Sequence, residues 1–307
     1  MKSAALSTSE REALRVRFEG RVRLEEPMSR HTSWHVGGPA ELFFEPRDRQ
    51  DLGEFLRELP TSAPITWVGL GSNLLVRDGG LRGAVITLHG ALGVLERRGD
   101  DQVWCEAGVP CARIARQCVR WGLGPAEFFA GIPGTLGGAL AMNAGAFGGE
   151  TWRHVRSVEV IDRSGMIHLR DAGEYRVSYR HIEPPVGGEA FLGALLQFEP
   201  RAGATTDTIR DLLVERKRKQ PIGEWSCGSV FTNPPGDHAA RLIEAAGLKG
   251  LRIGGASVSP KHANFIVNEG EASAADLEQL IGEVRETVHR RFGVRLETEV
   301  RIVGEAA

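Results

Sequence analysis

The chain has 307 residues, of which 41% are hydrophobic and 25% are charged, and its formal net charge is −2. These values are typical of globular proteins and exclude a strongly basic nucleic-acid binder or a polybasic membrane-surface protein. No apolar run approaches the roughly 20 residues that span a bilayer, and the first residues lack the apolar stretch of a signal peptide. We therefore expect a cytoplasmic protein of two or three domains.

Residues 1–90 are predicted to form a first α+β unit. Helical propensity near the N-terminus gives way to a strand before residue 30, and a second short strand follows Ala40. An amphipathic helix is predicted over 48–59, because its leucines and Phe55 recur on one face. Strands at 64–68 and 85–88 complete the unit.

Two further units are predicted, over 91–200 and 201–307. The second unit has a helix after Pro110 and four strands, at 102–106, 155–161, 166–169 and 191–198. The third has helices at 207–219, 237–247 and 272–292, the last closed by Gly293, and strands at 253–258, 264–267 and 294–303. The final strand is free to pack back toward the first two units.

The four cysteines give no metal-binding pattern. Cys105, Cys111, Cys118 and Cys227 form no Cys-x-x-Cys pair and have no histidine at a zinc-like spacing. Cys111 and Cys118 are seven residues apart in a predicted helix, so they share a face and are expected to be buried. We therefore predict no metal site and no disulfide.

Glycine is concentrated in two segments. Residues 131–149 contain seven glycines and no charge, and Gly69 and Gly71 follow a predicted strand, with Ser72 and Asn73 after them. Glycine lets main-chain N–H groups approach a phosphate closely. The Gly69–Gly71 turn lacks the third glycine of a dinucleotide fingerprint, the 131–149 segment does not show that fingerprint either, and no P-loop lysine follows either segment. The pattern predicts a phosphate-bearing ligand held between the two turns.

Four polar residues have both a structural and a chemical interpretation. Ser229 lies in Gly-Ser-Val-Phe, which is no nucleophile elbow; it is either a turn serine or an oriented proton donor. Arg180 is either a solvated surface residue or a guanidinium whose paired N–H groups bind a carboxylate. Glu297 and Glu299 share one face of the last strand, and the pattern alone does not choose between them.

The ordered set of motifs is more informative than any one of them. The set consists of Thr-Ser-Trp-His-Val-Gly-Gly-Pro-Ala from residue 32, the two glycine segments, Tyr179-Arg180, Gly-Ser-Val-Phe-Thr-Asn-Pro from residue 228, Lys-His-Ala-Asn-Phe-Ile-Val-Asn from residue 261, and Glu299-Val-Arg. From about residue 20 to residue 303 the chain resembles the UDP-N-acetylenolpyruvoylglucosamine reductases of peptidoglycan precursor synthesis.

The resemblance implies an α+β fold: a two-lobed FAD-binding fold of the vanillyl-alcohol-oxidase type, followed by an α+β substrate-binding domain. It implies bound FAD, NADPH as co-substrate, and hydride transfer to the enolpyruvyl group of a UDP-sugar, in a monomer without nucleic-acid or membrane partners. The residues expected to bind FAD are Gly69, Gly71, Ser72, Asn73, Leu74, Gly131, Pro133, Gly134, Thr135, Gly138, Ala139, Asn143 and Gly145.

By the same resemblance, Ser229 matches the family's proton donor, Arg180 the arginine that polarises the substrate carboxylate, and Glu299 the acidic partner. The positions matching those that bind the UDP moiety are Lys219, Asn233 and Lys261.

The chain departs from the family pattern at Thr232, where the family often has Lys, and at Ile182, where it often has Ser. The short segment after His181 predicts the subtype without a substrate-clamping tyrosine insertion. Cys227 is a rival proton donor. The alternative functions are another flavin-dependent oxidase or dehydrogenase on the same fold, and a nucleotide-sugar binding protein without redox chemistry.

Overall fold

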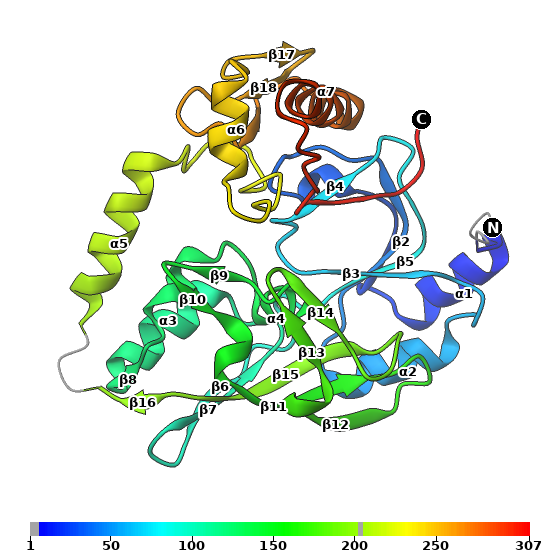
Figure 1. Cartoon of the computed structure of the whole chain (residues 1–307). Coiled ribbons are helices and arrows are strands. Elements are labelled where there is room, and N and C mark those ends of the chain that lie inside the picture. Colours follow the sequence, from blue (N-terminus) through cyan, green and yellow to red (C-terminus); the bar gives the residue numbers. More distant parts are fainter. Residues whose placement is uncertain (1–5, 202–204) are drawn as a thin grey trace. The chain divides into compact units, whose positions relative to one another are not determined.

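Figure 1 shows a computed structural model of the chain, which describes residues 6–201 and 205–307. The chain divides into two compact units. Unit 1 comprises Met1–Leu24, Leu42–Leu70 and Gly83–Val214, and unit 2 comprises Glu25–Glu41, Gly71–Arg82 and Glu215–Ala307. The chain therefore passes from one unit to the other between Leu70 and Gly71, inside the first glycine-rich turn.

Unit 1 contains a five-stranded antiparallel sheet with strand order β12-β11-β15-β7-β6. The core beside it is fully apolar and includes the buried face of helix α3, with Cys111, Ile114 and Cys118. The predicted burial of the two cysteines is confirmed. The strands are β6 (Leu95–Arg98), β7 (Gln102–Glu106), β11 (Val155–Ile161), β12 (Ile167–Asp171) and β15 (Ala190–Gln197), and α3 is Cys111–Arg120.

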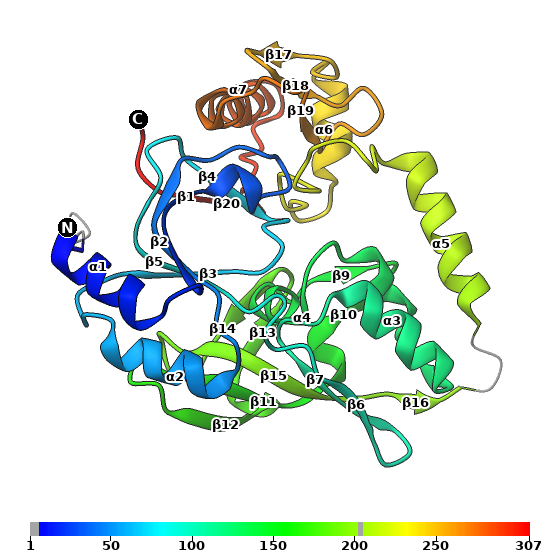
Figure 2. The same cartoon turned by 180° about the vertical axis from the view of Figure 1, so that it is seen from behind.

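Helix α2 (Arg49–Glu58) is the amphipathic helix that the sequence predicts. Asp48 caps its N-terminus by accepting from the Asp51 N–H, and its apolar face is buried in a second core. At the other end, the Arg163 guanidinium donates to the carbonyls of Leu59, Pro60 and Ala63. Helix α1 (Thr8–Arg17) lies beside α2 in Figures 1 and 2, and the Phe18 and Phe55 rings meet edge to face.

A four-stranded sheet has the order β1-β2-β5-β3, and its β3–β5 pair is parallel, as expected of a βαβ connection. Its strands are β1 (Val22–Pro27), β2 (Pro39–Phe44), β3 (Ile65–Val68) and β5 (Leu81–Thr87).

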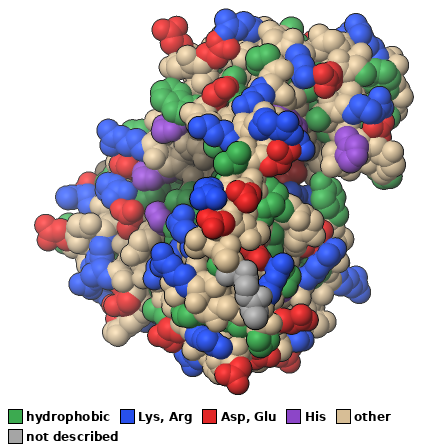
Figure 3. Space-filling view, turned by 90° about the vertical axis from the view of Figure 1, so that its left-hand side faces the viewer, with side chains coloured by type: hydrophobic (Ala, Val, Ile, Leu, Met, Phe, Trp, Pro, Cys, Tyr) green, Lys and Arg blue, Asp and Glu red, His purple; other side chains and the backbone are tan. Residues whose placement is uncertain are grey.

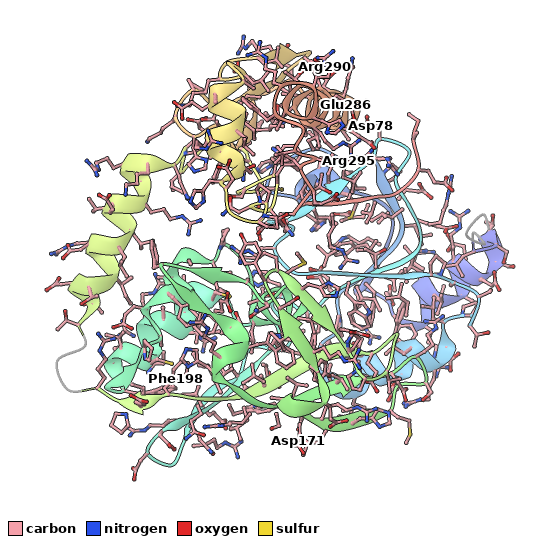
Figure 4. All side chains as sticks on the ribbon, in the orientation of Figure 1. Asp78, Asp171, Phe198, Glu286, Arg290 and Arg295 are labelled. Atoms are coloured by element: carbon pink, nitrogen blue, oxygen red, sulfur yellow. The ribbon has the colours of Figure 1, made fainter. Side chains whose placement is uncertain are left out.

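Unit 2 is built around helix α7 (Ala274–Phe292), whose buried side chains pack with α6 (Ala239–Ala245) and the β17-β18-β19 sheet. The Asp78 carboxylate accepts hydrogen bonds from the Ala274 and Ala275 amides at the start of α7, and Figure 4 labels Asp78 beside this helix. The Arg77 guanidinium forms a bidentate ion pair with Glu278, which lies one helical turn further along α7. These contacts fix the segment after β4 (Leu74–Val76) against α7.

The remaining elements are short, apart from α5. They are α4 (Leu136–Ala141), α5 (Thr206–Lys219), β8 (Leu123–Gly124), β9 (Gly145–Ala146), β10 (Gly149–Glu150), β13 (Arg176–Ser178), β14 (His181–Glu183), β16 (Glu199–Pro200), β17 (Arg252–Ile253), β18 (Ala256–Val258), β19 (Ile266–Asn268) and β20 (Arg301–Val303). Among the described residues, no helix combines the length and the apolar character that crossing a membrane requires. On the face that Figure 3 shows, basic and acidic side chains are interspersed.

Several sequence predictions in the third unit need comment. The helix ending at Phe292 is confirmed, and Gly293 closes it with φ 71°. The single strand predicted at 253–258 is wrong: it is the hairpin β17–β18, with Gly254 and Gly255 at its turn. The predicted strand at 294–303 is correct only for β20, because residues 294–300 make irregular contacts instead of a regular ladder.

Candidate active site

The turn at Gly69 lies against the second glycine-rich segment. A Cβ atom at residue 69 would lie 2.7 Å from the Thr135 hydroxyl oxygen, so any side chain at this position would force that hydroxyl to move. Both residues belong to unit 1. The structure therefore brings together the start of the first glycine turn and the centre of the second.

Within the second segment, some main-chain amides are already used by the fold. The Leu136 N–H donates to the Val109 carbonyl at 2.9 Å, and the Gly137 N–H to the Ala107 carbonyl at 2.8 Å. Gly138 is different: it is exposed, and a Cβ there would meet nothing within 4 Å. The main chain at Gly138 is therefore accessible to a bound cofactor. The Leu136 and Gly137 amides, by contrast, hold the segment in place through their hydrogen bonds.

Asn143 is buried and adopts a left-handed φ of 41°. Its side-chain oxygen accepts from the Trp152 N–H at 3.2 Å, and its Nδ2 donates to the Ser178 carbonyl at 3.1 Å. The amide predicted to face the cofactor thus ties the glycine-rich segment to the strand that precedes Arg180.

Arg180 lies in the two-residue turn of the β13–β14 hairpin, which pairs Ser178 with His181. The sequence did not predict this hairpin. Arg180 has φ 56°, a left-handed conformation that such turns usually give to glycine or asparagine. Its Nη2 donates to the Gly145 carbonyl at 3.1 Å. A non-glycine residue held in this conformation points to a functional constraint on its side chain.

Ser229 lies in unit 2, half-buried, in a segment fixed by Asn264. The Val230 N–H donates to the Asn264 main-chain carbonyl at 2.9 Å. The Asn264 side chain accepts from the Phe231 N–H at 3.0 Å and donates to the Phe231 carbonyl at 2.8 Å. Asn264 therefore makes the hydrogen bonds to this segment that a neighbouring strand would make in a sheet. Its place in the apolar run 263–267 is the signal in the sequence that could have identified it, because a buried amide needs partners.

Glu299 lies on the segment that runs beside Ser229. Its N–H donates to the Val230 carbonyl at 2.8 Å, and the Thr232 N–H donates to the Glu297 carbonyl at 2.9 Å. On its other side, the Asn73 Nδ2 donates to the Glu299 carbonyl at 3.0 Å. The structure thus brings Asn73, Ser229 and Glu299 together within unit 2. Glu299 is half-buried, whereas Glu297 is exposed.

Cys227 is buried among main-chain groups of the first glycine turn. Its thiol is buried, and burial raises its pKa to about 12. The sulfur lies 3.5 Å from both the Gly71 and the Leu74 carbonyl oxygens, with the thiol as the donor. These contacts favour a structural role for Cys227.

The predicted substrate-binding side chains of unit 2 contact the end of α5 or the start of α6. Lys219 pairs with Glu215 at the end of α5, and the Lys261 ammonium donates to the Lys217 carbonyl at 2.6 Å. Asn233 accepts from the Ala239 N–H at the start of α6. Each of the three has a local partner, and Lys219, Asn233 and Lys261 are exposed.

The predicted site residues therefore fall into two groups. Unit 1 holds Arg180 together with Gly69, Gly131, Pro133, Gly134, Thr135, Gly138, Ala139, Asn143 and Gly145, and unit 2 holds Ser229 and Glu299 together with Gly71, Ser72, Asn73, Leu74, Lys219, Asn233 and Lys261.

Comparison with known proteins identifies the family. The C-terminal domain model of UDP-N-acetylenolpyruvoylglucosamine reductase matches residues 220–303, and an FAD binding domain model matches residues 40–170. The UDP-N-acetylenolpyruvoylglucosamine reductase of Alkalilimnicola ehrlichii is 60% identical over 288 residues, which cover 94% of this chain and 96% of that protein. The chain belongs to the UDP-N-acetylenolpyruvoylglucosamine reductase family.

Two further relatives agree. The enzyme of the same name from Methylococcus capsulatus is 57% identical, over 92% of this chain and 92% of its own length. The crystal structure of the reductase from Thermus caldophilus is 34% identical, with a TM-score of 0.76, and the match covers 92% of this chain and 97% of that one. The predicted family and the predicted FAD-binding fold are confirmed. The chain is an FAD-dependent oxidoreductase of peptidoglycan precursor synthesis.

Proposed function

We propose that this chain reduces the enolpyruvyl group of UDP-N-acetylglucosamine enolpyruvate to the lactyl group of UDP-N-acetylmuramate, and that Arg180, Ser229 and Glu299 act on that group. One observation carries the proposal. Ser229 and Glu299 lie on adjacent segments joined through Val230, so an alcohol and a carboxyl group are supplied to one place in unit 2.

The residues present fit FAD. The exposed backbone at Gly138 and the close approach of Gly69 to Thr135 are features expected of a loop that binds a phosphate-bearing cofactor. Ser72 adds a hydroxyl donor. We propose that these residues and the others predicted around them hold the cofactor, and that Asn73 contributes its main chain, since its side-chain amide is bonded to the Glu299 carbonyl. When bound, FAD supplies to C3 of the enolpyruvyl group a hydride that it has taken from NADPH.

Addition of a hydride to C3 leaves an electron pair on C2, next to the substrate carboxylate. Ser229 holds the proton that C2 requires, and the serine oxygen regains a proton from solvent afterwards. Arg180 offers two parallel donors to the substrate carboxylate, where they stabilise the negative charge that develops there. Glu299 stands beside Ser229 as the acidic partner.

The remaining binding residues are part of the same proposal. Lys219 and Lys261 supply positive charge for the diphosphate, and Asn233 supplies an amide for the uridine moiety. Residues 1–90 and 91–200 are the two cofactor lobes, and residues 201–307 bind the substrate. We further propose a monomer that works in the cytoplasm, where its nucleotide-linked substrate is made.

The decisive experiment is anaerobic and uses the flavin absorbance of the holoenzyme. NADPH is expected to bleach the flavin, and UDP-N-acetylglucosamine enolpyruvate is expected to restore its colour, with UDP-N-acetylmuramate as the product. Oxygen then serves as the comparison oxidant. If oxygen restores the colour and the enolpyruvate does not, the proposed substrate is wrong and an oxidase function is favoured.

A further inference from the structure

The turn formed by Gly71, Ser72, Asn73 and Leu74 has a single well-defined position in unit 2. Gly71 is left-handed, with φ 60°, and a Cβ there would lie 2.0 Å from the His31 carbonyl oxygen. The Gly71 carbonyl accepts from the Ser33 N–H at 3.2 Å. The turn is therefore packed tightly onto residues 31–33, and its side chains start from a fixed backbone.

Asn73 uses this fixed position to hold the segment that carries Glu299. Its Nδ2 donates to the Glu299 carbonyl at 3.0 Å, and its own carbonyl accepts from the Arg301 N–H at 3.1 Å. The two bonds lie on either side of residue 300. They fix the two peptide units that follow Glu299. The regular pairing of β20 with β4 starts at the end of this stretch, with Arg301 opposite Leu74.

The same turn also contacts the segment that carries Ser229. The Cys227 thiol lies 3.5 Å from the Gly71 and Leu74 carbonyl oxygens, two residues before Ser229. One four-residue turn thus bonds to both segments of the proposed proton-delivery pair. The Asn73 side-chain amide of the turn bonds to the Glu299 segment, and main-chain carbonyls of the turn accept from the Cys227 thiol of the Ser229 segment.

We infer that Asn73 is a positioning residue for Glu299, and that its side-chain amide acts on the second half of the reaction through that carboxyl group. This inference rests on the proposed roles of Ser229 and Glu299. A displacement of about 1 Å of a reacting group costs up to about 100-fold in rate. Loss of the Asn73 side-chain amide is therefore expected to slow reoxidation by the enolpyruvate by about 10- to 100-fold, and to slow reduction by NADPH much less.

The experiment compares Asn73→Ala, Asn73→Asp and Glu299→Gln in the holoenzyme. Rapid mixing under anaerobic conditions gives the rates of the two half-reactions over a range of pH, and absorbance gives the FAD content of each variant. Asn73→Asp keeps the shape of the side chain but cannot donate while it is ionised. Its rate is expected to recover relative to Asn73→Ala as the pH falls and the new carboxyl group is protonated.

The double variant Asn73→Ala/Glu299→Gln is the sharpest test. If Asn73 acts through Glu299, the double variant is expected to reoxidise at nearly the rate of Glu299→Gln alone, because the group being positioned is already lost. If the two losses multiply, Asn73 acts independently of Glu299 and the inference is wrong. Parallel loss of FAD or equal slowing of both half-reactions also overturns it, since the Asn73 side chain would then serve the cofactor instead of Glu299.

Asn268→Ala is the matched control. Asn268 lies in unit 2, where it is buried, and its side chain donates to the Trp34 carbonyl at 2.8 Å and accepts from the Gly270 and Ala272 amides. It is expected to lower thermal stability without changing the pH profile of reoxidation. If Glu299→Gln and Ser229→Ala reoxidise normally, the proposed function itself fails. If only Asn73→Ala does so, that function stands and this inference fails.

Discussion

The two units hold their proposed reacting groups in different ways. In unit 1, Arg180 is at the tip of a short hairpin, in a left-handed conformation, and the ties that position it come from Asn143 to Ser178 and from its own guanidinium to Gly145. In unit 2, Ser229 and Glu299 lie on adjacent segments bonded to one another through main-chain groups.

The difference matches the chemistry that each group would perform. A guanidinium that binds a carboxylate acts at the end of a long side chain, so a hairpin tip is an adequate support. A proton donor and its acidic partner must keep their relative positions, and main-chain hydrogen bonds between their two segments support this. In each unit an asparagine of the glycine-rich segment donates to a carbonyl near a proposed reacting group: Asn143 in unit 1 and Asn73 in unit 2.

The largest effect is expected for Ser229→Ala. Loss of the proton donor is expected to slow reoxidation by the enolpyruvate by about 10²- to 10⁴-fold, the usual contribution of a general acid. Reduction by NADPH is expected to stay within about twofold, since it needs no proton at C2. Stopped-flow absorbance of the two half-reactions measures both. Equal losses in the two would show a general defect instead of a missing donor.

Arg180→Lys tests the other side of the comparison. An ammonium keeps the charge but loses the planar fork, and the expected loss is on the order of 10²-fold in kcat/KM for the enolpyruvate. Steady-state kinetics at saturating NADPH measure it. Arg176→Lys is the matched control, because Arg176 lies on the same hairpin, is exposed, and pairs only loosely with Glu183 at 3.5 Å. Near-normal turnover of Arg180→Lys would mean that the substrate carboxylate does not need the planar guanidinium of Arg180.

Asn264→Ala is expected to cost stability in unit 2. The substitution leaves the buried N–H and carbonyl of Phe231 without their side-chain partner, and each such group costs about 1–3 kcal/mol. Urea unfolding is expected to show a lower midpoint, with FAD-dependent protection retained. An unchanged midpoint would mean that Phe231 finds other partners, and that the support of Ser229 in unit 2 is less rigid than its hydrogen bonds suggest.

These residues also show how far the sequence could predict the molecule. Helix α2 and helix α7 were predictable because their apolar periodicity and end signals are local. The roles proposed for Arg180, Ser229 and Glu299 follow from the family resemblance that the ordered motifs carry. By contrast, Asn73 contacts a residue 226 positions away, and no local pattern reveals such a partner. The Arg180 turn was missed for another reason, because its left-handed conformation contradicts the ordinary preference of arginine.

The acid stability of unit 2 is expected to depend on Glu278. The hydrogen bonds from Arg77 lower the pKa of Glu278 in the folded state. A carboxyl group with a lowered folded pKa stabilises the fold above its unfolded pKa, and this contribution is lost as the pH falls through the folded value. Glu278→Gln is therefore expected to lower stability at pH 7 by less than about 1 kcal/mol, given the partial exposure of the pair, and to make the difference vanish in acid. Thermal unfolding as a function of pH measures it.

The smallest stability change is expected for Arg180→Gly, and it sharpens the comparison most. Relief of the left-handed conformation is worth about 1–2 kcal/mol, and it is offset by the backbone freedom of glycine and by loss of the bond to Gly145. The unfolding free energy is expected to stay within about 1 kcal/mol of the parent, although turnover is lost. Phe147→Gly is the control, since Phe147 is exposed and has φ 50° without that bond. It is expected to be slightly stabilising. If Arg180→Gly instead unfolds unit 1, then Arg180 supports the hairpin as much as the hairpin supports Arg180, and the contrast with the bonded pair of unit 2 disappears.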